Sequence, residues 1–105
     1  MAETPPDPQD CTSMDEVRAG VDALDAQLVA LLARRFAYMR AAARLKPERS
    51  QVRDEARKAE VIANARAQVE ALGIPGEVAA ELWERLVELS IAYEFERWDE
   101  RRENS

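Results

Sequence analysis

The sequence predicts an all-α fold with three helices per chain, one of them very long, interlocked with a second copy as an intertwined homodimer. From Met14 to Lys46 the apolar residues recur with the period of an α-helix, and no segment alternates as a β-strand does. A helix over residues 13–46 spans roughly 51 Å, whereas a compact domain of this size has a radius of gyration of only ~13 Å. In a monomer its apolar stripe would face water, so we expect an obligate dimer.

Composition narrows the class of protein. The 105 residues suit one domain, which we expect over residues 13–102, behind a disordered leader over residues 1–12 that is rich in Pro and Asp. The net charge of -6 disfavours nucleic acid and anionic membranes as partners. The chain has a single cysteine, Cys11, no signal-peptide pattern and no apolar run approaching ~18 residues, so we expect a cytoplasmic protein.

Local signals place the ends of the three helices. Ser13 followed by Glu16 reads as a capping box at the start of the first helix, and Pro47 ends it. A second, shorter helix ends at Gly73, and Pro75 opens the third. The second helix is marked by the apolar residues Val61, Ile62, Ala65, Val69 and Leu72.

Two cations, Arg35 and Lys46, fall on the apolar stripe of the first helix, where a leucine is expected. A buried cation needs an anionic partner, and few acidic residues share this stripe, so the partner could be a ligand. The alternative is that both side chains run along the edge of the core with their charged ends in water. The sequence leaves the two interpretations open.

Arg18 extends the set of cations. It precedes Arg35 by roughly 25 Å and Lys46 by roughly 42 Å along one helix axis, whereas Arg35 and Lys46 are only about 16 Å apart. Arg18 could therefore join the other two at one small ligand only from a second, antiparallel chain. The alternative is an ordinary solvated arginine at the edge of the stripe.

The third helix carries Ser90 and Glu94 inside its apolar arc, four residues apart and therefore neighbours on the helix surface. Glu94 could instead be a structural acid that pairs with Arg97 or with a cation of the first helix. Histidine is absent from the chain, which removes the usual proton shuttle, His/Cys metal clusters and Ser/His or Cys/His nucleophilic pairs. We therefore expect neither a metal nor a conventional nucleophile.

These residues and their spacing together resemble the all-helical chorismate mutases and their close relatives, the isochorismate-pyruvate lyases. The matching elements are Arg18 with Asp25 seven residues later, Arg35, Lys46, the run Val52-Arg53-Asp54-x-x-Arg57, and Ser90 with Glu94. The resemblance implies three helices per chain in an interlocked dimer with two sites, each built from both chains. It places Arg18 in the site of the partner chain. The other matching residues would act in the site of their own chain: Arg35, Lys46, Asp54, Arg57, Ser90 and Glu94.

The resemblance also implies the chemistry. Chorismate is a small dianion, and its conversion to prephenate is a unimolecular [3,3] rearrangement that needs no nucleophile, metal or cofactor. Arg18 and Arg35 would grip carboxylates, while Lys46 would bind a carboxylate and donate to the ether oxygen. Arg35, Lys46 and Glu94 are thus the predicted catalytic residues, with Arg57 supporting the charge pattern and Asp54 ordering the loop.

Two positions depart from the usual mutase pattern. Lys58 stands where a glutamate commonly contacts the ring hydroxyl, and Glu94 stands where a glutamine commonly faces the ether oxygen. The leader around Cys11 and the tail around Tyr93 and Trp98 look more like the lyase branch, which releases pyruvate from isochorismate and leaves salicylate. Chorismate mutase is the predicted function. The lyase is the first alternative, and a non-enzymatic helical dimerisation module is the second.

Overall fold

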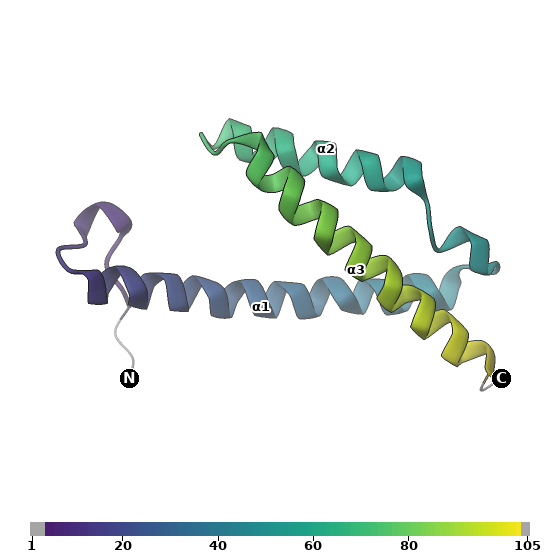
Figure 1. Ribbon diagram of the computed structural model, residues 1–105. Helices are drawn as coiled ribbons and strands as arrows, with labels where there is room; N and C mark the ends of the chain where they lie inside the picture. Colours follow the sequence, from purple (N-terminus) through teal and green to yellow (C-terminus); the bar gives the residue numbers. More distant parts are fainter. Residues whose placement is uncertain (1–3, 104–105) are drawn as a thin grey trace. The chain divides into compact units, whose positions relative to one another are not determined.

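The computed structural model describes residues 4–103, and in this range every regular element is a helix (Figure 1). Three long α-helices follow one another as α1 (Met14–Leu45), α2 (Glu55–Ala71) and α3 (Gly76–Glu103). Two short 3₁₀ turns, η1 (Pro8–Asp10) and η2 (Arg49–Gln51), precede α1 and α2. The predicted all-α class with three helices is confirmed.

Side-chain caps fix the start of α1 next to the predicted residue. The Ser13 hydroxyl accepts from the Glu16 backbone N–H at 3.2 Å, as in a capping box. The Glu16 carboxylate reaches one residue further back and accepts from the Thr12 backbone N–H at 2.9 Å. Hydrogen bonds from the Thr12 backbone N–H and hydroxyl lower the pKa of Glu16 below its usual value. The other end of α1 is Leu45, two residues before Pro47.

The chain forms two compact parts, divided after Phe36. In the first, residues 4–11 lie against the start of α1, and the Cβ of Pro5 comes within ordinary contact distance of the Gly20 position. The turn η1 lies within the leader for which composition predicts disorder, and that disorder stays a prediction. Residues 1–3 of the leader lie outside the described residues. The apolar stripe of α1 is open in this part, with Leu24 58%, Leu28 56% and Leu31 61% exposed.

The second part contains the end of α1, η2 and the helices α2 and α3, which contact each other and diverge from the turn that joins them (Figure 1). Asp54 caps α2 by accepting from the Arg57 backbone N–H at 2.9 Å. Gly73, with φ of 82°, takes the left-handed conformation that terminates helices, and α3 begins directly after Pro75. These ends agree with the turn residues predicted from the sequence.

The buried apolar cluster of the second part is small. Val52, Val87 and Ile91 form its centre, and four half-buried residues pack against it: Val61, Trp83, Phe95 and Trp98. Large side chains remain open on the outside of α3, among them Leu82 at 60%. Among the described residues, none of the helices is long and apolar enough to cross a membrane.

Candidate active site

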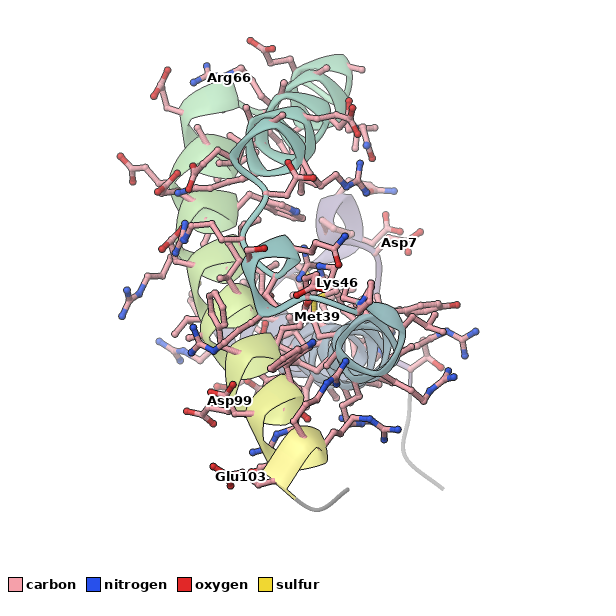
Figure 2. All side chains as sticks on the ribbon, turned by 90° about the vertical axis from the view of Figure 1, so that its right-hand side faces the viewer. Asp7, Met39, Lys46, Arg66, Asp99 and Glu103 are labelled. Atoms are coloured by element: carbon pink, nitrogen blue, oxygen red, sulfur yellow. The ribbon has the colours of Figure 1, made fainter. Side chains whose placement is uncertain are left out.

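The centre of the candidate site is an ion pair between Lys46 and Glu94. Their Nζ and Oε2 atoms are 2.7 Å apart, and the Glu94 side chain is only 5% exposed while that of Lys46 is 30% exposed. Lys46 directly follows α1, and Figure 2 shows it where the chain leaves that helix. Of the structural partners that the sequence left open for Glu94, the observed one is the cation at the end of the first helix. The carboxylate of this pair is buried, whereas the Lys46 side chain is partly exposed and can meet an anion from solvent.

Ser90 lies one helical turn before Glu94 and is also buried, at 3%. Its hydroxyl donates to the Leu86 carbonyl of its own helix at 2.7 Å. The structure therefore brings three of the predicted residues, Lys46, Ser90 and Glu94, to one region of the second part of the chain. Their roles toward a ligand stay predictions.

An open cleft of about 640 Å³ lies beside Lys46. It is lined by Ala42, Leu45, Lys46, Pro47, Gln51, Arg53, Asp54 and Glu55. The predicted residues Lys46 and Asp54 thus share a cleft, and Asp54 caps the start of α2. The role of Asp54 in ordering the loop of the site stays a prediction. Arg53 is a second cation at this cleft, and the sequence interpretation named it within a matching run without giving it a role in the site.

Arg57 does not line this cleft. Its side chain is 62% exposed and pairs with Glu60, one turn further along α2. Arg18 and Arg35 belong to the first part of the chain, where Arg18 is 69% exposed with its closest acidic partner, Asp15, at 3.9 Å. Arg35 is half-buried there. For all three arginines, a role in substrate binding stays a prediction.

A network of charges joins α2 to α3 next to the cleft. Glu88 accepts from Arg53 at 2.9 Å and from Lys58 at 2.8 Å, and Lys58 also donates to Glu84 at 2.7 Å. Hydrogen bonds from Arg53 and then Lys58 lower the pKa of Glu88 to about 2, and Glu84 followed by Glu88 raises the pKa of Lys58. Lys58 is therefore held by two carboxylates of α3.

This network predicts a loss of stability in acid. The pKa of Glu88 is about 2 in the folded chain against an ordinary 4.5, so its contribution is complete above pH 4.5 and is lost as pH falls through about 2. Glu88→Gln should therefore be less stable at neutral pH and show a flatter fall in stability between those values. Urea unfolding across that range measures both effects. Equal slopes for the two proteins would show that Glu88 does not carry the acid sensitivity.

The sequence interpretation missed two residues that contact Lys46. Trp98 Nε1 donates to the Lys46 carbonyl at 3.0 Å, and the Arg102 guanidinium donates to the same carbonyl at 2.6 Å. The spacing of four residues that joins Ser90 to Glu94 continues to Trp98 and Arg102, and it could have indicated that all four share one face of α3.

The lysine–glutamate pair beside an open cleft is an arrangement suited to binding a small anion. Residues 17–95 match the family model described as chorismate mutase type II, and the chain belongs to that family. A curated relative, the isochorismate pyruvate lyase of Pseudomonas aeruginosa, is 26% identical over 95 residues, which cover 90% of this chain and 94% of the relative. The resemblance found in the sequence is thereby confirmed, and the family supports an enzyme rather than a non-enzymatic module.

Proposed function

We propose that this protein is a chorismate mutase that converts chorismate to prephenate. The observation that carries the proposal is the Lys46–Glu94 pair at 2.7 Å beside the cleft, in a chain of the chorismate mutase type II family. In the rearrangement the ether C–O bond breaks as a new C–C bond forms within one molecule, so the protein holds a compact conformer and stabilises charge on the ether oxygen. Lys46 serves this by donating to that oxygen and holding a carboxylate.

In this proposal Glu94 is the second hydrogen-bond donor to the ether oxygen. An ionised carboxylate only accepts hydrogen bonds, so Glu94 donates to the ether oxygen in its protonated form. A dianionic substrate occupies the Lys46 ammonium and brings negative charge beside Glu94, where a neutral hydrogen-bond donor is more favourable than a second negative charge. The burial of the Glu94 side chain, at 5% exposure, supports this arrangement because little water reaches this group to screen its interactions.

This arrangement predicts a specific effect of Glu94→Gln. Glutamine is a permanent donor of the same length, so the variant should keep or raise activity at about pH 7 to 8. Rates of prephenate formation between about pH 5 and 8 measure this. A Gln variant that is inactive throughout this range would leave Glu94 as a structural partner of Lys46.

We further propose that the active unit is an intertwined homodimer in which Arg18 of the partner subunit completes each site. Two observations support it: the open apolar stripe of α1 and the small buried cluster of the second part. Sedimentation at micromolar concentration should show a dimer that dissociates only on unfolding. A folded, stable monomer at that concentration would contradict the dimer and, with it, the shared site.

The isochorismate-pyruvate lyase reaction is the second candidate, because the relative with that name aligns over nearly its whole length. Lys58 also supports it, since a lysine bound by Glu84 and Glu88 offers no acceptor for a ring hydroxyl. Both reactions use a dianion and rearrange bonds within one molecule, so the same cations suit either.

Product analysis separates the two candidates. Purified protein is incubated with chorismate and, separately, with isochorismate, and prephenate, salicylate and pyruvate are quantified. The proposal expects prephenate from chorismate with the larger kcat/KM. Salicylate and pyruvate from isochorismate with the larger kcat/KM would favour the lyase, and no product from either would contradict both.

A further inference from the structure

The end of α1 is held by side chains from α3. A helix leaves its last four carbonyls without partners inside the helix. Here the Arg102 guanidinium donates to the Ala43 carbonyl at 3.0 Å and to the Lys46 carbonyl at 2.6 Å. Trp98 Nε1 donates to that second oxygen at 3.0 Å. A cation at this end also complements the partial negative charge of the helix terminus.

These contacts come from one face of α3. Glu94, Trp98 and Arg102 are four residues apart, so they follow one another along the helix surface. The Arg102 guanidinium lies over the Trp98 ring at 4.0 Å from its centre, which keeps both donors aimed at the same oxygen. This face of α3 thus contacts both ends of Lys46. Glu94 binds the Lys46 ammonium, and Trp98 and Arg102 bind the Lys46 carbonyl.

Holding the carbonyl matters because lysine has a long, flexible side chain and stands at a helix end, where backbones fray. A side chain can direct its ammonium reproducibly only when its own backbone is fixed, and displacements of about 1 Å can cost as much as 10²-fold in rate. We propose that Trp98 and Arg102 are positioning residues that fix the backbone of Lys46, and through it the ammonium that acts on the substrate. The proposal rests on the proposed function for its kinetic consequences only.

Two variants each remove the hydrogen-bond donor of one side chain and keep a side chain of similar size. Trp98→Phe retains an aromatic ring without the N–H, and Arg102→Met retains a long apolar stem over the ring. Each should lower kcat about 5- to 30-fold and change KM by less than about threefold, because the lost alignment matters most in the transition state. Arg102→Lys, which keeps a charged donor, should recover activity to within about threefold of wild type. Arg101→Met, at the exposed neighbouring position of the same helix, removes the same charge and should leave kcat unchanged.

A spectroscopic measurement keeps this proposal separate from the proposed function. The carbonyl ¹³C resonance of Lys46 should shift in Trp98→Phe and Arg102→Met, and the amides of the last turn of α1 should exchange faster, with neither change in Arg101→Met. An inactive wild type would contradict the proposed function, and these shifts would still test the anchoring. If one variant fails to fold by circular dichroism, the other decides. An unshifted resonance, or kcat within about twofold of wild type in a folded variant, would overturn the positioning role.

Discussion

Replacing both members of the central pair, as Lys46→Met/Glu94→Leu, should leave the protein as stable as wild type and lower turnover at least about 10³-fold. Glu94 is 5% exposed, so Lys46→Met alone strands a buried carboxylate and should lower the free energy of unfolding by about 1–3 kcal/mol. The double replacement removes both charges and substitutes apolar contacts, which is commonly neutral or stabilising. Urea unfolding and rates of prephenate formation measure the two effects on the same preparation.

A matched pair of charges serves as the control. Arg66 and Glu77 form an ion pair at 3.0 Å between α2 and α3, and Figure 2 shows Arg66 well away from Lys46. Arg66→Met/Glu77→Gln removes the same number of charges and should leave turnover within about twofold of wild type, since exposed pairs contribute little. If the double variant at Lys46 and Glu94 kept its activity, the pair would be structural and the proposed site would be wrong.

The second large effect concerns a site shared between chains. Arg18→Ala and Lys46→Ala should each lower turnover by at least about 10²-fold, because each removes a charge that acts on the substrate. When the two are unfolded and refolded together in equal amounts, about half of the dimers are mixed, and each mixed dimer has one intact site if Arg18 acts in the partner's site. The mixture should then regain about a quarter of wild-type activity.

A second mixture controls for recovery by any other route. Lys46 and Glu94 contact each other within one chain, so mixed dimers of Lys46→Ala and Glu94→Ala carry one lesion in every site. This mixture should regain no activity. If the Arg18 mixture also regained nothing although mass spectrometry found mixed dimers, Arg18 would not act across the dimer.

The helices and their ends were predictable because the signals are local. Each signal acts on residues only a few positions away, and a helix begins or ends beside each of them. The signals are the pair Ser13 and Glu16, Gly73, and Pro75. The period of the apolar residues likewise depends only on position along one helix. The long first helix was therefore visible in the sequence without knowledge of any tertiary contact.

The partners of the charged residues were not predictable in the same way. The sequence left Arg97 and a cation of the first helix as alternatives for Glu94, and only the fold brings residue 46 beside residue 94. Arg97 lies against the Tyr93 ring and pairs with Glu100 instead. Such pairs depend on how α3 packs against the end of α1, a long-range arrangement that local propensity does not encode.

The capping of α1 by α3 was missed for a related reason. In the sequence, Trp98 stands out only as part of the tail, and the position of a tryptophan in a sequence does not show which acceptor its N–H will meet. Its acceptor is a backbone carbonyl, which every residue carries and no sequence pattern marks. The spacing of four residues along α3 was the only trace of this contact in the sequence.

Binding of a stable dicarboxylate that mimics the compact, bicyclic transition state of the chorismate rearrangement tests the central claim most directly. Isothermal titration of the wild-type protein should show one molecule bound per chain, with affinity at least about 10²-fold above that of a flexible dicarboxylate of the same charge. Lys46→Met/Glu94→Leu should lose this preference, and Arg66→Met/Glu77→Gln should keep it. Equal affinity of the wild type for the two dicarboxylates would contradict a site built for this rearrangement.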